Sequence, residues 1–204
     1  MRFCSIASGS SGNCIYVGSE NTHVLVDTGI SGKKMEAGLN SLDLTGRDLD
    51  GILITHEHSD HIKGLGVISR KYGIPIYTTG GTVDAMARTN ALGKIPDEIF
   101  HEIKEDESFE IGDLTVKPFS IPHDAAQPVG YRLECEGHSV GIATDLGKYN
   151  DYIIENLQNL DALLLEANHD IRMLQVGRYP YYLKQRITIV SPQEITRRPA
   201  LDTK

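Results

Sequence analysis

The sequence predicts a protein of mixed α/β or α+β class, and three observations support this. Short β-branched runs bounded by Gly, Ser, Asn or Asp are typical of strands. Amphipathic segments flanked by glycine lie between these runs and are typical of helices. The chain has 204 residues, of which 40% are hydrophobic. This length is enough to bury one sizeable core, so we expect a single main domain.

The expected elements alternate along the chain. Early strands are expected at residues 2–7, 13–18, 23–27 and 51–55. Later strands are expected at residues 74–78, 108–112, 114–121, 129–135, 139–144 and 161–167. Helices are expected at residues 31–42, 61–73, 80–92 and 149–160.

The pattern changes after residue 187. One apolar run, 188–191, is followed by a polar and unperiodic segment, 192–204. We therefore expect a folded domain over residues 1–187 and an irregular tail over 188–204.

Composition limits the expected partners and location. A formal charge of −8 argues against a broad basic face for nucleic acid. It does not exclude a nuclease, because bound divalent cations attract a phosphodiester locally. No run approaches the roughly 18 apolar residues of a membrane span, and no signal-peptide pattern is seen, so we expect a cytoplasmic protein. Cys4, Cys14 and Cys135 are widely spaced and are expected to be reduced core residues.

The most informative segment follows the expected strand 51–55. Four residues of metal-binding type stand within six positions: His56, His58, Asp60 and His61. Residues two apart on a strand face the same side, so the two first histidines would point to one cation. Asp60 and His61 would reach a second cation from the start of the next helix. A lone histidine is usually not a ligand, but burying four such groups would be costly without a compensating cation.

Two further residues fit the same pocket. His123 and Asp145 each come just after an expected strand. His123 would complete a three-imidazole first site, and Asp145 would bridge both cations through its two oxygens. The alternatives are an exposed loop for His123 and a helix cap for Asp145.

Residues around these ligands have expected roles as well. Asp27 ends a strand and would accept a hydrogen bond from a ligand imidazole, which fixes the tautomer of that ring. The glycine-rich turn 7–13, with Ser10 and Asn13, is either a simple hairpin turn or a contact for an anionic substrate. His23, His101 and His138 are expected to be surface residues.

Several longer motifs carry a family resemblance. Among them are SIASGSSGNC, VLVDTG, LITHEHSDHIKGLG, IPHDAAQPVGY, IATDLG and LLLEANHD. Over residues 1 to about 187 the chain resembles the YycJ/WalJ-type (VicX) hydrolases of the metallo-β-lactamase superfamily. The resemblance implies an αββα sandwich, two divalent cations, usually zinc or manganese, and a phosphodiesterase or 5′-to-3′ DNA exonuclease activity.

The chain departs from the family pattern at its C-terminal end. Family members continue beyond residue 187 with further helices, strands and two histidine motifs, one of which supplies the last metal ligand. Here no histidine follows His169. We therefore expect the C-terminal portion of the fold to be lacking and the second metal site to be weak or empty, unless His169 substitutes for the missing ligand.

These expectations combine into one hypothesis and two rivals. In the hypothesis, a water or hydroxide bound by the cations, with its pKa lowered towards about 7, attacks a phosphodiester, and Asp60 orients it and takes its proton. One rival keeps the metal site but hydrolyses a thioester, lactone or β-lactam. The residues 58–61, HSDH, resemble the nucleases of the superfamily more than the enzymes of this rival. Common zinc β-lactamases usually lack a histidine at the position of His61, and glyoxalase-like thioesterases typically have a tryptophan where this chain has Ser59. The other rival is an inactive truncated protein that only binds metal.

Overall fold

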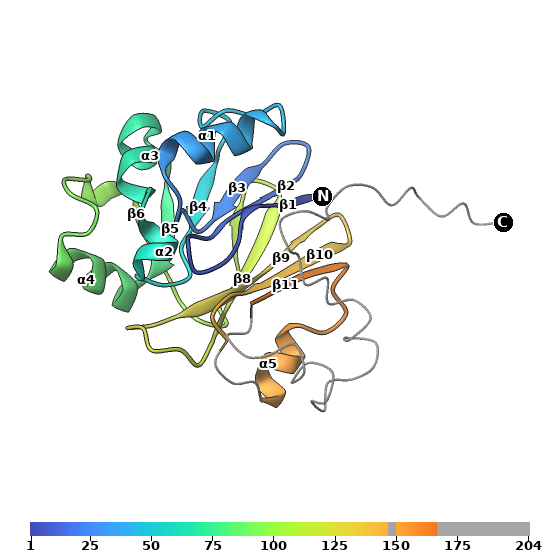
Figure 1. Ribbon diagram of the computed structural model, residues 1–204. Coiled ribbons are helices and arrows are strands. Elements are labelled where there is room, and N and C mark those ends of the chain that lie inside the picture. Colours follow the sequence, from blue (N-terminus) through green and yellow to red (C-terminus); the bar gives the residue numbers. More distant parts are fainter. Residues whose placement is uncertain (147–149, 167–204) are drawn as a thin grey trace.

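The computed structural model of the protein describes residues 1–146 and 150–166 (Figure 1). The expected irregular tail, 188–204, and the potential ligand His169 lie outside the described residues.

Within these described residues, six strands form the first sheet, in the order in which they occur in the chain. The first three pair antiparallel and the rest pair parallel to the strand before them. They are β1 (Arg2–Ala7), β2 (Cys14–Gly18), β3 (His23–Val26), β4 (Gly51–Leu53), β5 (Ile76–Thr79) and β6 (Phe100–Ile103).

The second sheet has five strands in the part of the chain that the structure describes, in the order β11-β10-β9-β8-β7. All neighbours pair antiparallel except β10 and β11, which are parallel. They are β7 (Phe109–Ile111), β8 (Leu114–Ser120), β9 (Val129–Cys135), β10 (His138–Ala143) and β11 (Ala162–Leu165).

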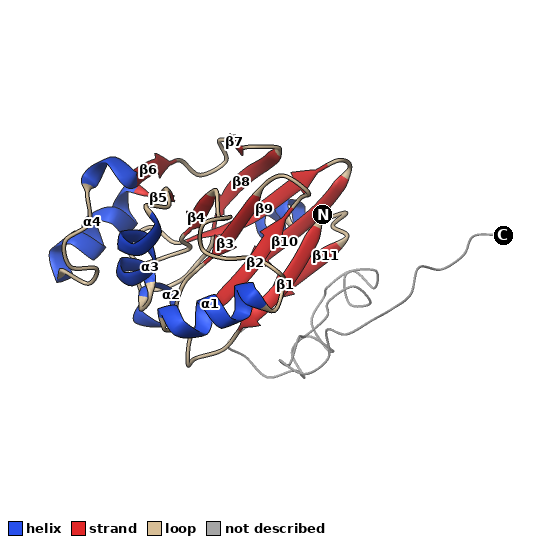
Figure 2. Ribbon diagram, turned by 90° about the horizontal axis from the view of Figure 1, so that it is seen from above, coloured by secondary structure: helices blue, strands red, loops and turns tan. Residues whose placement is uncertain are grey.

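The helices lie on the outer sides of the two sheets (Figures 1 and 2). Of the helices in residues 1–146 and 150–166, four cover the first sheet and one, α5, covers the second, which gives an αββα sandwich. They are α1 (Gly32–Asn40), α2 (Ser59–Ile62), α3 (Leu65–Tyr72), α4 (Gly80–Thr89) and α5 (Asp151–Asn156), with a short 3₁₀ turn at Asp97–Ile99.

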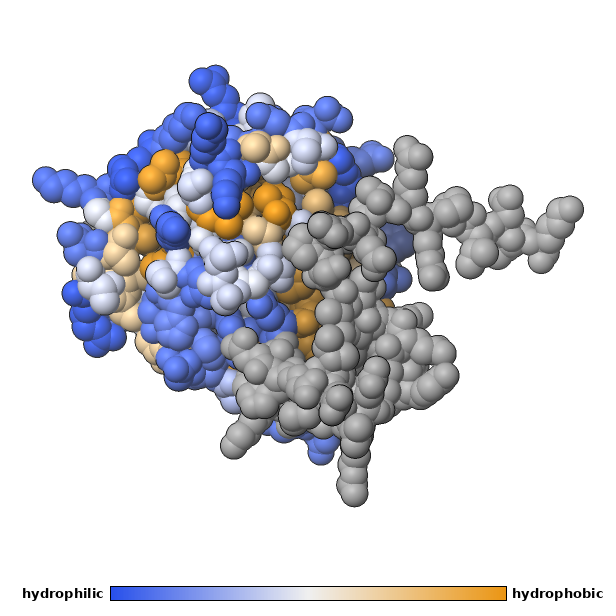
Figure 3. Space-filling view, in the orientation of Figure 1, coloured by the Kyte–Doolittle hydropathy of each residue, from blue (hydrophilic) through white to orange (hydrophobic). Residues whose placement is uncertain are grey.

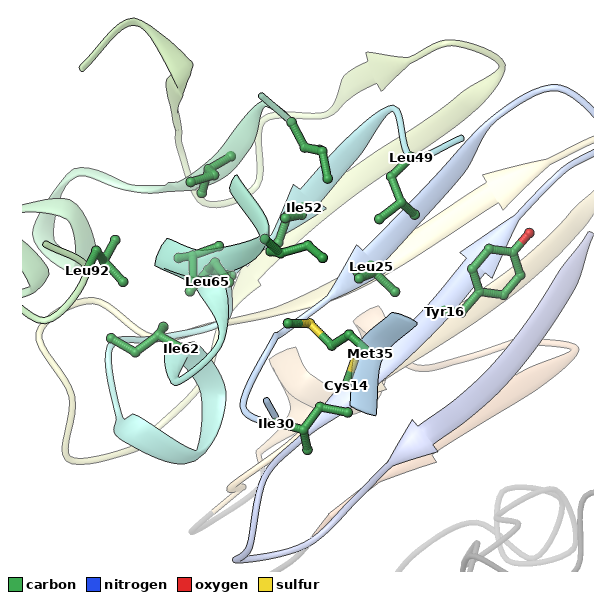
Figure 4. Close-up of a cluster of buried hydrophobic side chains, with 14 of the residues drawn as sticks. Cys14, Tyr16, Leu25, Ile30, Met35, Leu49, Ile52, Ile62, Leu65 and Leu92 are labelled. Atoms are coloured by element: carbon green, nitrogen blue, oxygen red, sulfur yellow. The ribbon is translucent and has the colours of Figure 1, made fainter. Parts of the chain in front are cut away.

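Three apolar clusters hold these layers together. The first joins the outer face of the first sheet to its helices, for example Tyr16 and Leu25 to Met35 and Leu65 (Figure 4). The second lies between the sheets and combines alternate residues of both, such as Ile15 and Val17 with Val116 and Leu133. The third packs α5 against the second sheet. Alternation of side chains across each strand explains why one strand serves two clusters.

Strand direction brings several loops to one edge of the sandwich. Strands β1, β3, β4 and β5 run the same way in the first sheet, as do β8, β10 and β11 in the second. Their carboxyl ends therefore gather at one end of each sheet, where ligand-binding loops are common. Six residues proposed from the sequence as metal ligands follow these ends: His56, His58, Asp60 and His61 come after β4, His123 after β8 and Asp145 after β10.

Most expected elements are confirmed, with three differences. The strand Phe100–Ile103 was not expected from the sequence. The helix expected at 61–73 is split into α2 and α3 at Lys63 and Gly64. The placement of His56 and His58 on a strand was wrong, because β4 ends at Leu53 and both residues follow it in a loop.

Candidate metal centre

The loop from Ile54 to His58 is tied to both sheets, which explains how it can hold side chains in place without being a strand. The N–H of Ile54 donates to the carbonyl of Tyr77 at 3.0 Å. The Ile54 carbonyl accepts from the Tyr131 hydroxyl at 2.7 Å. The N–H of Val129 donates to the Thr55 carbonyl at 3.0 Å. The histidines that follow therefore start from a rigid backbone between the two sheets.

Three imidazoles meet directly after this loop. The ring centroids of His56 and His58 are 4.6 Å apart, and those of His56 and His123 are also 4.6 Å apart. His123 Nε2 lies 3.2 Å from His58 Nδ1. One ring nitrogen from each of the three lies within 4.8 Å of the others. His123 is not in an exposed loop; only 12% of its side chain is exposed.

A second group contains His61 and two carboxylates. His61 Nε2 lies 2.7 Å from Asp145 Oδ2 and 3.6 Å from Asp60 Oδ2. The same Asp145 oxygen lies 3.8 Å from His56 Nε2, so Asp145 stands between the two groups. Asp145 does not cap a helix, since the N-cap of α5 is Asn150. Its backbone adopts φ 55°, a left-handed conformation that is costly for a residue other than glycine.

Asp27 orients two of these imidazoles from behind. Its Oδ2 accepts a hydrogen bond from His61 Nδ1 at 2.7 Å, and both side chains are fully buried. Its two oxygens also accept from the Thr55 hydroxyl, at 2.8 and 3.0 Å. The same hydroxyl oxygen lies 3.0 Å from His56 Nδ1 and can accept a hydrogen bond from its N–H. Since each Nδ1 is engaged as a donor, Nε2 of both rings carries the lone pair that faces the pocket.

The electrostatics of this pocket favour a cation. Burial lowers the pKa of His56 to about 2, and the neighbouring His61, His123 and His58 rings contribute to this shift. The His56 ring is therefore neutral. Burial alone would also lower the pKa of His61, but Asp27 and Asp145 raise it to about 10. These two carboxylates, Asp27 at Nδ1 and Asp145 at Nε2, stabilise positive charge on the His61 ring, and they would also stabilise a metal ion bound at Nε2.

The residues present therefore fit a divalent metal. His56 Nε2 is buried and has no hydrogen-bond partner among the described residues. Burying an unpaired nitrogen costs free energy, unless its lone pair binds a metal ion. Imidazole nitrogens and carboxylate oxygens are the donor types that zinc and similar ions prefer.

The turn between β1 and β2 is fastened to α2, which carries Asp60 and His61. The N–H of Asn13 donates to the Asp60 carbonyl at 2.7 Å, and the Asn13 amide nitrogen lies 3.1 Å from His61 Nε2. Asn13 is 1% exposed, and its Oδ1 accepts from the N–H of Gly9. Ser10 is exposed at the tip of the turn. The side chain of Asn13 thus contacts the ligand cluster and not the surface.

Glu57 fastens the loop that carries His123. Its Oε1 accepts a hydrogen bond from the N–H of Ala126 at 2.9 Å, although the two residues are 69 positions apart. Further along the same loop, Gln127 Oε1 accepts from the N–H of Gly81 at the start of α4. Glu57 therefore joins the two chain segments that supply the three-imidazole group.

Glu166 is a residue at this pocket that was not singled out from the sequence. It directly follows β11, and its N–H donates to the Ala143 carbonyl at the end of β10. Burial raises the pKa of its carboxyl group, and so do Asp145 and Asp60. The available signal was its position, because parallel strands end at the same edge and Glu166 ends the strand beside that of Asp145.

The three remaining described histidines lie away from this pocket. His23 Nδ1 lies 2.9 Å from the Tyr16 hydroxyl, and His101 stacks on Tyr77. His138 is exposed and lies 3.5 Å from Asp161.

Comparison with known proteins agrees with this geometry. Residues 22–194 match the family described as the beta-lactamase superfamily domain. Exodeoxyribonuclease YycJ of Bacillus anthracis is 41% identical over 187 residues, which cover 92% of this chain and 70% of that protein. The chain belongs to the YycJ/WalJ family of the metallo-β-lactamase superfamily. Exodeoxyribonuclease WalJ of Streptococcus pneumoniae is also 41% identical, over 91% of this chain and 69% of its own length. This YycJ/WalJ-family chain is thus a metal-dependent hydrolase.

Solved structures support the fold of the YycJ/WalJ family. Zn²⁺-bound PqqB from Methylobacterium extorquens has a TM-score of 0.64 and 18% identity, over 82% of this chain and 64% of that one. The Rm3 metallo-β-lactamase has a TM-score of 0.63 and 18% identity, over 86% of this chain and 81% of that one. At this level of identity the likeness concerns the fold alone.

Within the part of the chain that the structure describes, no helix has the length and apolar character needed to cross a membrane.

Proposed function

We propose that this chain is an exodeoxyribonuclease that hydrolyses phosphodiester bonds with two divalent cations. One observation carries the proposal: Asp145 Oδ2 lies between His56 Nε2, at 3.8 Å, and His61 Nε2, at 2.7 Å. A carboxylate that stands between two groups of ligands is suited to bridge two cations. The relatives named exodeoxyribonucleases support the reaction and the substrate.

The first cation would be held by His56, His58 and His123, with Asp145 as the shared ligand. The second would be held by Asp60, His61 and Asp145. Among the described residues, the second cation has fewer nitrogen ligands, and Asp60 lies 3.6 Å from His61 with 32% of its side chain exposed. We therefore expect the second cation to bind more weakly and to complete its coordination with water.

The bound cations would lower the pKa of a water molecule and neutralise the charge of the phosphate. Asp60 would orient that water and accept its proton, and its partly exposed carboxylate beside the ligand cluster supports this role. Asp27 and Thr55 keep the lone pairs of His61 and His56 directed at the pocket.

Two finer points of the proposal rest on the family resemblance. We propose zinc as the cation, with manganese as the alternative, and cleavage in the 5′-to-3′ direction. The cytoplasmic location expected from the sequence stays a prediction.

Metal analysis combined with a substrate panel tests the proposal. The purified chain is loaded with zinc or manganese, freed of excess metal and analysed for bound ions. It is then assayed on end-labelled DNA, on bis(p-nitrophenyl) phosphate, and on a thioester and a lactone. We expect up to two bound ions and stepwise shortening of DNA. Hydrolysis of the thioester or lactone without cleavage of either phosphodiester would contradict the proposal, and so would a chain that binds no metal.

A further inference from the structure

We propose that the backbone of the DNA substrate binds across a lysine patch formed by Lys33, Lys34 and Lys63, with Val67 at its centre. This inference rests on the proposed nuclease function and adds the surface that holds the substrate.

The patch adjoins the metal centre through α2. Lys63 directly follows that helix and stands two positions after His61. Lys33 and Lys34 lie in the first turn of α1, which packs beside α3. Figures 1 and 2 both show α1 beside α3 on the outer side of the first sheet, with α2 next to α3.

Close packing between the helices makes the patch continuous. A Cβ atom built on Gly32 would lie 3.2 Å from Val67 Cγ1, so the start of α1 touches α3. The N–H of Gly64, next to Lys63, donates to the Thr28 carbonyl at 2.8 Å. The three lysines thus project from segments that are fixed to one another.

The side chains of the three lysines are exposed to solvent. None of them forms an ion pair with another described residue, whereas nearby Lys71 pairs with Glu36. The first turn of α1 contains no acidic residue. Positive charge at a helix N-terminus opposes the helix dipole, so Lys33 and Lys34 do not serve the stability of α1. Exposed, unpaired cations of this kind are suited to bind phosphates.

Acidic and basic residues are distributed unevenly over the described chain, and this affects where DNA can approach the metal centre. Among the described residues from 96 to 166, which include the second sheet, sixteen are acidic and three are basic, namely Lys104, Lys117 and Arg132. Residues 1–95 contain nine of each kind. A polyanion is repelled by the acidic part and meets the metal centre with least repulsion over α1, α2 and α3.

Val67 adds an apolar contact to the patch. It is the one large hydrophobic side chain of the described residues that is exposed, at 52%. Figure 3 shows hydrophilic side chains over the α1–α3 side of the molecule, with hydrophobic ones between them. A single apolar side chain among lysines can pack against a sugar or a base while the lysines bind the phosphates.

A charge-matched pair of variants tests the proposal. The first variant combines Lys33→Ala, Lys34→Ala and Lys63→Ala. The control combines Arg88→Ala, Lys94→Ala and Lys104→Ala, which removes the same charge from exposed positions outside the patch. DNA affinity is measured by fluorescence anisotropy on labelled single-stranded and duplex DNA over a series of salt concentrations. Turnover of bis(p-nitrophenyl) phosphate and thermal unfolding are measured in parallel.

We expect the patch variant to bind DNA about tenfold or more weakly than the control at low salt, with its salt dependence reduced by about one phosphate contact per lysine. Turnover of the small ester and thermal stability should stay as in the wild type. Equal DNA affinity and salt dependence of the two variants would overturn the patch while leaving the nuclease function intact. A wild-type protein that hydrolyses the small ester but neither binds nor cleaves DNA would overturn the nuclease function, and the patch with it.

Discussion

The carboxylate of Asp27 and the imidazole of His61 form a fully buried pair, with Oδ2 and Nδ1 at 2.7 Å. The Thr55 N–H and hydroxyl also donate to Asp27, so one carboxylate accepts hydrogen bonds from three donor groups. Because the Thr55 hydroxyl donates to Asp27, its oxygen is free to accept a hydrogen bond from His56 Nδ1. Asp27 adopts φ 60°, and its left-handed backbone is held in place by these bonds.

Replacing Asp27 by Asn should weaken metal binding. An amide offers one acceptor oxygen in place of two and turns an NH₂ group towards other donors, so the His61 ring loses its fixed tautomer. We expect the affinity for the second cation to fall roughly 10- to 100-fold. Competition with a chromogenic chelator measures this affinity. Asp113→Asn is the control, because Asp113 bonds to Ser19 at the opposite end of β8 from His123. Equal zinc affinity of both variants would show that the tautomer is fixed by other means.

Replacing Asp60 by Ala should abolish hydrolysis of bis(p-nitrophenyl) phosphate. The expected loss in kcat is about 10²- to 10⁴-fold, since Asp60 would accept the proton of the attacking water. The affinity for the first cation should stay near the wild type, because Asp60 is not one of the residues proposed to hold it. Asp84→Ala removes an exposed carboxylate from α4 and serves as the control. Unchanged turnover would remove the role assigned to Asp60.

Replacing Glu57 should lower the affinity for the first cation only when the new side chain has no hydrogen-bond acceptor. Glu57→Gln keeps an oxygen for the N–H of Ala126, whereas Glu57→Ala leaves the His123 loop without this tie. We expect Glu57→Ala to lower zinc affinity about tenfold and Glu57→Gln to stay near the wild type. The absorption spectrum of the cobalt-substituted protein reports the geometry of the three imidazoles. If the two variants behave alike, the hydrogen bond to Ala126 does not position His123.

Replacing Gly29 by Ala should disturb the second cation and lower stability. A Cβ atom at this position would overlap the carbonyl of Asp60. The backbone of α2 must then move, at a cost of roughly 1–3 kcal/mol in the free energy of unfolding. Gly32→Ala is the control in the same segment, because its Cβ would only approach the Val67 side chain. Thermal unfolding with and without zinc compares the two. Equal stability and equal zinc binding would contradict the close packing of Gly29 on α2.

Differences between expectation and structure have local physical causes. The helix expected at 61–73 breaks at Gly64 because the backbone there packs against the Ile30 carbonyl and donates to Thr28. Strand β6 was missed because it alternates poorly: its two central residues are exposed and, among the described strands, it pairs with β5 alone. The strand before His56 ends early because Tyr131 and Val129 of the second sheet take up the backbone groups of Ile54 and Thr55.

The sequence by itself determined the ligand types, the strands that precede them and the fold class. These features depend on side-chain chemistry and on periodicity, which are local properties of the chain. The tertiary structure decided which residues support the ligands, among them Asn13, Thr55, Glu57 and Glu166. Their roles arise from hydrogen bonds and packing between segments far apart in the sequence, and only the stacking of two sheets brings those segments together.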